Sequence, residues 1–153
     1  MSTLRVDSLQ GQTAGTNRYV VQVVYGLLSS ELSYSDTTTH DILSVSITPN
    51  SSSNKILLMG NFAHYLNGQT ATERGDYQFK RGSTVIFQTS TNGYGYFREN
   101  GNLKTMNNTH NFLDSPNTTN AVTYTMVHDP YAYGSGGSFG VNVTNLTLME
   151  IAQ

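Results

Sequence analysis

The chain has 153 residues and a mass of 16.8 kDa, which is the size of one ordinary domain. Only 12% of the residues are charged, and the net charge of -2 comes with no basic cluster larger than Lys80 and Arg81, which excludes a nucleic-acid-binding surface. No cysteine is present, which excludes disulfides and thiolate chemistry, and no apolar run is long enough for a signal peptide or a membrane span.

The first 18 residues differ from the rest, because they hold few apolar side chains and then become rich in glycine and threonine. We predict an extended N-terminal arm over residues 1–18, followed by a single knob domain over residues 19–153. The arm is compatible with a frayed terminus, and it is also compatible with a strand that orders on a neighbouring chain. In the second interpretation the anchoring residues are Leu4, Arg5, Val6 and Leu9.

Short runs of β-branched and aromatic residues then recur along the chain without helical periodicity. They predict strands over residues 19–28, 43–47, 55–66, 122–126 and 141–151, and a hairpin over residues 76–88. Polar connectors are expected over residues 29–41, 49–54, 67–75, 89–111, 114–120 and 129–138. About eight strands result, so the predicted fold is all-β, a single β-sandwich or jelly-roll-like domain whose last strand is central. Leu57 and Tyr124 are expected on buried sheet faces.

The sequence offers no pattern that is typical of catalysis, metal binding or cofactor binding. The four histidines, His40, His64, His110 and His128, form no ligand pair and are assigned no catalytic role; His64 and His128 are expected to be structural hydrogen-bonding groups. No G-x-S-x-G motif accompanies the many serines, and a glycosidase pair of carboxylates requires a separation that the sequence does not define. Glu150 is unusual because it interrupts an apolar strand, so we expect its side chain either to emerge at an edge or to find a partner, for example in an interface salt bridge.

Aromatic residues gather in two of the polar connectors. They are Tyr94, Tyr96, Phe97, Tyr131 and Tyr133. Tyrosine beside asparagine and aspartate suits sugar stacking and wet protein interfaces, although packing within the loops explains the same pattern. These residues are therefore candidates for a glycan-binding or interface loop.

Several segments together resemble a family of small structural proteins of tailed phages that infect marine and freshwater bacteria. They are STLRVDSLQG, SITPNSSSNKILLMGNF, FKRGSTVIF, FLDSPNTTNAVTYTM and NLTLMEIAQ, and they span nearly the whole chain. The sequence departs from the pattern of this family mainly over residues 89–111 and 129–137. It implies a non-enzymatic virion protein, made in the host cytoplasm, that forms a homotrimeric knob on the particle surface and is held by its first residues to another virion protein.

Two positions on the particle are compatible with the sequence, and the first of them, decoration of the capsid, is favoured. Neither heptads nor an internal repeat is present, so the chain does not form a complete long fibre. One alternative is a capsid decoration protein bound to the major capsid protein. The other is a knob on a tail fibre or tail tip that binds a host surface glycan.

Overall fold

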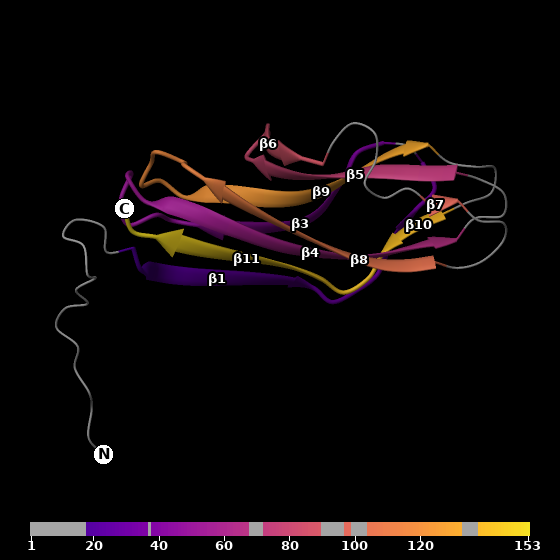
Figure 1. The fold of residues 1–153 in the computed structure, drawn as a ribbon, viewed down its shortest axis with the longest axis horizontal. Helices are drawn as coiled ribbons and strands as arrows, with labels where there is room; N and C mark the ends of the chain where they lie inside the picture. Colours follow the sequence, from indigo (N-terminus) through magenta and orange to yellow (C-terminus); the bar gives the residue numbers. More distant parts are fainter. Residues whose placement is uncertain (1–17, 37, 68–71, 90–96, 99–103, 133–137) are drawn as a thin grey trace, which may run out of the picture.

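The computed structural model describes residues 18–36, 38–67, 72–89, 97–98, 104–132 and 138–153. Within these ranges the chain forms β-strands and no helix, and hence no helix that could cross a membrane. The strands are β1 (Val20–Leu28), β2 (Leu32–Tyr34), β3 (His40–Ile47), β4 (Lys55–Asn67), β5 (Thr72–Arg81), β6 (Thr84–Gln88), β7 (Phe97–Arg98), β8 (Lys104–Asp114), β9 (Val122–Ala132), β10 (Ser138–Val141) and β11 (Thr144–Ile151). The predicted all-β class is confirmed, since the strands form two antiparallel sheets packed as a sandwich (Figure 1).

The order of the strands is that of a jelly roll. In sheet A, one side of β4 pairs with β11 and then with β10, and the other side pairs with β8. The outer neighbour of β11 is β1, and the outer neighbour of β10 is β2. In sheet B the order is β3, β9, β5, and then β6 and β7. Apart from the β5–β6 hairpin, successive long strands alternate between the two sheets, as two interlocked Greek keys require.

The predicted hairpin is confirmed between β5 and β6. Phe79 pairs with Phe87 and Arg81 with Thr84, so the turn is short. Gly82 in this turn has a φ of 57°, in the left-handed region that only glycine adopts without strain. Its amide donates to the carbonyl of Thr123 at 2.9 Å, which ties the turn to β9.

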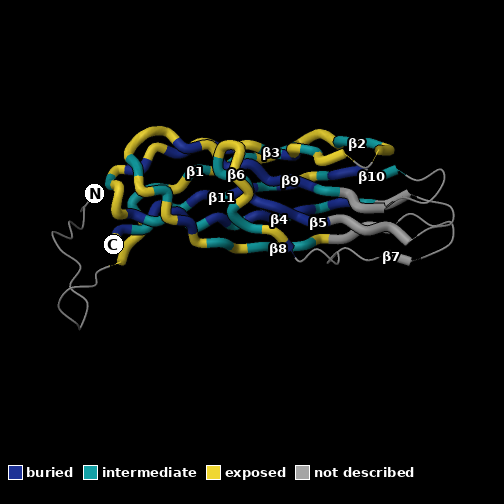
Figure 2. Tube along the Cα trace, turned by 90° about the horizontal axis from the view of Figure 1, so that it is seen from above, coloured by how far each residue is buried: buried dark blue, intermediate teal, exposed yellow. Residues whose placement is uncertain are grey.

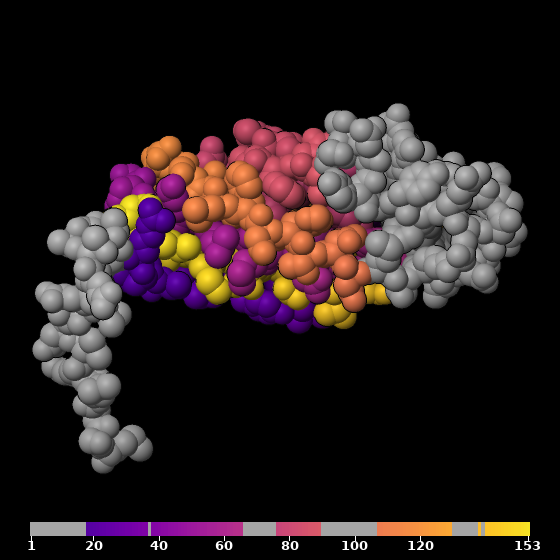
Figure 3. Space-filling model, viewed as in Figure 1, coloured from indigo at the N-terminus to yellow at the C-terminus, as the bar shows by residue number. Residues whose placement is uncertain are grey.

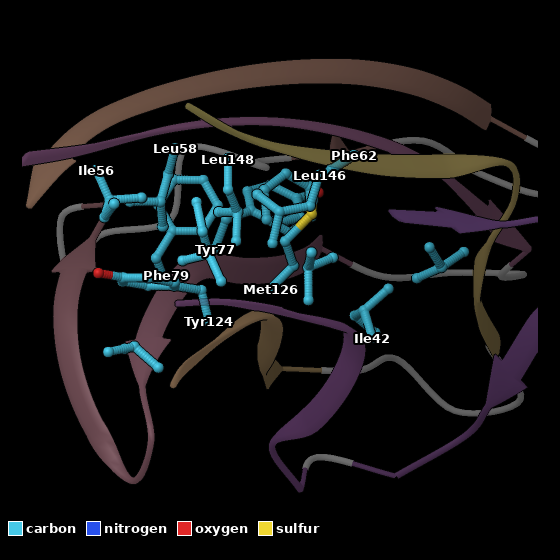
Figure 4. Packing of buried hydrophobic residues seen from close by; sticks show 14 residues of the cluster. Ile42, Ile56, Leu58, Phe62, Tyr77, Phe79, Tyr124, Met126, Leu146 and Leu148 are labelled. Atoms are coloured by element: carbon cyan, nitrogen blue, oxygen red, sulfur yellow. The ribbon is translucent and has the colours of Figure 1, made fainter. Parts of the chain in front are cut away.

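The core lies between the sheets and is built from alternate residues of the central strands. Figure 2 shows buried positions concentrated along β4, β9 and β11. In Figure 4 the side chains of both sheets meet in one apolar layer, with the Phe62 and Tyr77 ring centres 4.5 Å apart. Gly60 belongs to this layer, since a Cβ there would lie 2.8 Å from the Phe79 ring.

Several predicted connectors are wrong, because they contain strands. β8 begins within the predicted 89–111 connector and occupies its last part, from residue 104, and β2 lies within the predicted 29–41 connector. β8 escaped the pattern because two of its inward positions carry Asn108 and His110 instead of aliphatic residues. A strand with polar residues on its inner face has no period-two hydrophobic signal.

The burial of β4 corrects a second expectation. Leu58 is fully buried, whereas Leu57 is only partly buried and lies on the outer face of sheet A, between Met149 of β11 and Leu113 of β8. Tyr124 is fully buried as predicted. The expectation that the last strand is central is also confirmed, because β11 lies between β1 and β4.

Candidate functional site

The outer face of sheet B is polar, and its side chains satisfy one another. Ser44 and Thr125 share a hydrogen bond of 2.8 Å across β3 and β9. One pair further along, Ser46 and Thr123 do the same at 2.7 Å. Lys80 of β5 donates to Asp41 at 3.0 Å, which adds a third polar pair to this face.

The outer face of sheet A is more apolar, although Thr147 and Asn111 share the row of Tyr25, and Asn145, Asn61 and Thr109 share the row of Leu27. We call "the apolar face" the outward residues Val23, Tyr25 and Leu27 of β1, Met149 of β11, Leu57 and Met59 of β4, and Leu113 of β8. One cross-strand row runs through Val23, Met149, Leu57 and Leu113, so apolar side chains extend across four strands. Such a surface on one sheet of a small domain indicates a protein contact.

Most of the exposure on this face belongs to β1. The side chains of Val23, Tyr25 and Leu27 are 54%, 57% and 48% exposed, and Tyr19 and Val20 just before them are exposed as well. β1 is an edge strand, because it pairs with β11 on one side only among the described strands. In Figure 3 this strand, in indigo, lies along the lower margin of the molecule.

The interior holds a cluster of histidine and tyrosine rings. Tyr77 of β5 lies at its centre, with its ring centre 5.4 Å from those of His64 and His128 and 5.7 Å from that of His110. The Tyr77 hydroxyl lies 2.7 Å from His64 Nδ1, and the Tyr34 hydroxyl lies 2.5 Å from His128 Nδ1. His64 and His128 thus act as structural hydrogen-bonding groups, as the sequence predicted.

Burial keeps these rings neutral. Desolvation lowers the pKa of His64 to about 4, although a hydrogen bond with the Phe62 backbone opposes the shift. Desolvation, reinforced by His64 and His40, lowers the pKa of His128 to about 3, and burial lowers that of His110 as well. Burial also raises the pKa of Tyr77, so the cluster carries no charge at neutral pH.

At the surface, His40 holds the loop before β3 through hydrogen bonds and does not belong to a catalytic triad. His40 Nε2 lies 2.8 Å from Asp36 Oδ1 and 3.4 Å from Thr38 Oγ1. Both partners share one ring nitrogen, whereas a triad needs the acid and the nucleophile on opposite nitrogens. Hydrogen bonds from Thr38 and His40 lower the pKa of Asp36 to about 2. No cluster of three or more metal-binding side chains occurs in the part of the chain that the structure describes.

The L-D-S-P turn after β8 is held by an ion pair. Arg81 Nη1 donates to both carboxylate oxygens of Asp114, at 3.0 and 2.9 Å, and to the Ser115 carbonyl. The buried Tyr124 hydroxyl donates to the same carboxylate at 2.7 Å. This network joins the end of β8 to sheet B and explains the turn motif structurally.

Glu150 finds its partners within its own chain, and it neither emerges at an edge nor forms a salt bridge with any described residue. Its side chain is fully buried, and its carboxylate accepts from the Gln22 amide at 2.6 Å, the Asn54 amide at 2.6 Å and the Asn50 backbone at 2.7 Å. Burial alone would raise its pKa, but the hydrogen bonds from Asn54, Gln22 and the 50–51 backbone lower it below the usual value. Neutral donors of its own chain therefore hold the charge, and they fasten the β3–β4 loop to β11.

The predicted binding residues are only partly covered by the structure. Leu4, Arg5, Val6 and Leu9 of the arm, and Tyr94, Tyr96 and Tyr133 of the loops, lie outside the described residues. Phe97 is in β7, and Tyr131 is in β9 and not in a loop as expected. The strands of these two residues flank β5, since Phe97 pairs with Glu73 and Ala132 with Arg74. The structure thus brings the two aromatic segments to the same end of sheet B.

The apolar face was not among the features predicted from the sequence. The sequence of β1, VVQVVYGLL, indicates this face, because it is apolar at positions on both the inner and the outer face of the sheet. A strand at a sheet edge with one face in water should alternate instead. Because the pattern does not reveal whether a strand is central or at an edge, the excess of apolar residues was read only as a buried strand.

The comparisons with known proteins concern the fold. The sequence matches no protein-family model and no curated protein. A chain in the structure of the infectious bursal disease virus Gt strain is similar with a TM-score of 0.50 and 9% identity, over 98% of this chain and 42% of that chain. A chain in the T13 particle of the same virus has a TM-score of 0.49 and 10% identity, over 85% and 37%. Dimeric latent PorU from Porphyromonas gingivalis has a TM-score of 0.47 and 13% identity, over 83% and 12%.

The likeness is one of fold. This chain spans less than half the length of each of these proteins. At such low identity the match with the Gt-strain chain identifies a shared sandwich architecture, which many unrelated functions use.

Proposed function

We propose that this chain is a non-enzymatic structural protein of a virus particle, present as a homotrimeric knob on the particle exterior. The observation that carries the proposal is the contrast between the two sheets. The outer face of sheet B carries polar side chains that pair with one another, whereas the outer face of sheet A leaves large apolar side chains of β1 exposed. The jelly-roll architecture, which viral capsid proteins also use, supports the same interpretation by analogy of fold.

The favoured position is that of a capsid decoration protein. In this proposal residues 1–18 anchor the knob to the major capsid protein through Leu4, Arg5, Val6 and Leu9. The described chain begins beside β1, at the same end of the sandwich as the C-terminus (Figure 1). An anchor there leaves the opposite end of the sandwich free to face outward.

A knob on a tail fibre or tail tip is the second candidate, and one observation favours it. Phe97 and Tyr131 lie on strands that flank the start of β5, at the end of the sandwich opposite the chain termini (Figure 1). Aromatic residues on strands far from the anchor are where we expect a host glycan to bind. Titration of the full chain with host polysaccharide, with Tyr131→Ala as the variant, tests this alternative.

Imaging of intact particles tests the proposal and separates the two positions. Hundreds of copies in register with local three-fold positions of the capsid would support decoration, and a few copies at the tail would support the receptor-binding knob. Deletion of residues 1–15 should leave a folded trimer that no longer attaches to particles. Turnover of a substrate, or a monomer with no affinity for particles, would contradict the proposed function.

A further inference from the structure

We propose that the exposed side of β1, formed by Val23, Tyr25 and Leu27, is the surface through which copies of this chain pack around their three-fold axis. The inference rests on the proposed homotrimer and names the contact that would hold it. Its occupant is a second copy of the same chain. The argument depends on how this edge is built, on its size and on its charge.

β1 lacks the features that protect edge strands from association. It is nine residues long and contains no charged residue and no proline. Its register shift near Val20 is confined to the start of the strand. The corresponding edge of sheet B, β3, carries Asp41 beside a register shift. Because natural edges are shortened, charged or bulged when they face solvent, a long uncharged edge indicates that β1 is covered.

The surface is large enough for a contact between copies. At about 3.3 Å per residue and 4.8 Å between strands, the outer face of sheet A formed by β1, β11, β4 and β8 measures about 26 by 19 Å, or roughly 500 Å² in projection. Side chains that stand out from this plane add to the accessible area. The total is of the same order as the roughly 800 Å² that each partner buries in a stable interface.

The charge of the surface suits a copy of the same chain. In the rows from Val23 to Leu27 across sheet A, every outward residue is uncharged, and the neighbouring row contributes only Lys55. Identical residues approach one another around a symmetry axis, so a charged strip would repel itself there. Apolar side chains from three copies instead form a common core beside the axis.

This arrangement also places the anchor. Arg18, the first described residue, lies just before β1, so a β1 contact brings the three attachment points of residues 1–17 to one side of the trimer. Three attachment points close together would bind as one multivalent unit, which raises the effective affinity for a partner.

Two pairs of variants test the contact in the full-length chain. Val23→Asp places a charge on the proposed contact, and Val85→Asp is its control, because Val85 is 43% exposed and lies on β6 of the other sheet. Val23→Cys and Val85→Cys form the second pair, and each creates the only thiol of a cysteine-free chain. The readouts are native mass, circular dichroism and a non-reducing gel after oxidation or a short bis-maleimide.

We expect the wild type and Val85→Asp to have three times the 16.8 kDa chain mass and Val23→Asp to be a folded monomer. Val23→Cys should give linked pairs at twice the chain mass, and Val85→Cys should not. A trimer that survives Val23→Asp, with no linked pairs, would overturn the β1 contact and leave the proposed function standing.

The remaining outcomes separate the other possibilities. A dimer with linked Val23→Cys pairs would overturn the three-fold arrangement. A wild-type monomer that binds particles, but loses binding on Val23→Asp, would assign the surface to another virion protein and overturn the inference. A wild-type monomer that does not bind particles would reject the proposed function itself.

Discussion

Mild acid should destabilise this fold through its buried histidines. The pKa values of His64 and His128 are lowered to about 4 and about 3, from an ordinary value near 6.5. At pH 7.5 both rings are neutral in the folded and unfolded chains, so they make no pH-dependent contribution. As the pH falls below about 6.5, the unfolded chain binds protons first, and the free energy of unfolding decreases until the pH reaches the folded pKa values.

The size of the effect follows from these shifts. At pH 5 an unfolded histidine is almost fully protonated, whereas both buried rings remain neutral, and each contributes a loss of about 2 kcal/mol. Together they remove about 4 kcal/mol between pH 7.5 and pH 5, a large part of the roughly 5–15 kcal/mol of a typical domain. His110, whose pKa is also lowered, acts in the same direction.

Urea denaturation at pH 7.5 and pH 5, followed by circular dichroism at one fixed protein concentration, measures this loss. The His64→Gln variant keeps a hydrogen-bonding group for the Tyr77 hydroxyl but does not titrate, so it should reduce the loss by about 2 kcal/mol. Equal free energies of unfolding at the two pH values, or an undiminished loss in His64→Gln, would refute the reasoning.

Three further predictions test the packing. Leu58→Ala should lower the free energy of unfolding by about 3 kcal/mol, because the Leu58 side chain is fully buried. Leu57→Ala should lower it by less than about 1 kcal/mol, because Leu57 faces outward. Equal losses for the two variants in chemical denaturation would contradict the register of β4. Glu150→Gln should cost about 2 kcal/mol at pH 7. Because the folded pKa of Glu150 is lowered, its contribution to the free energy of unfolding is present above its ordinary pKa and is lost as the pH falls. The free energy of unfolding of Glu150→Gln should therefore depend less on pH below about pH 4.5. An unchanged pH dependence would argue against the hydrogen bonds that hold the Glu150 carboxylate. His110→Phe should raise the melting temperature by a few degrees, since His110 Nε2 is buried without a hydrogen-bond partner among the described residues and Phe62 and Phe87 surround the ring; a lower value would indicate an unseen partner.

The strands that alternate strictly could be predicted from the sequence. In β3 the apolar residues Val45 and Ile47 are buried and the serines between them are exposed, as the period of two requires. The β5–β6 hairpin was equally accessible, because a short turn with glycine between two apolar runs is a local signal. In these segments the residues that define the pattern are neighbours in sequence.

The candidate site could not be predicted in the same way. The buried ring cluster joins Tyr77 to His64, His110 and His128 from three other strands, and each of these residues is isolated in the sequence. Glu150 likewise meets Asn50 and Asn54 only because β11 ends beside the β3–β4 loop. Contacts between distant residues depend on strand order, which no local pattern encodes.

The sequence by itself determined the all-β class, the hairpin, the low charge of the chain and the absence of disulfides, because composition and short-range periodicity control these properties. The tertiary structure alone decided which side of each apolar run is buried. The run KILLMGNF supplies apolar residues to both faces of β4, and only its pairing with β11 and β8 turns Leu58 inward and Leu57 outward. The position of β1 at the edge then leaves Val23 and Tyr25 uncovered, since a sheet has neighbours for its central strands but none beyond its last one.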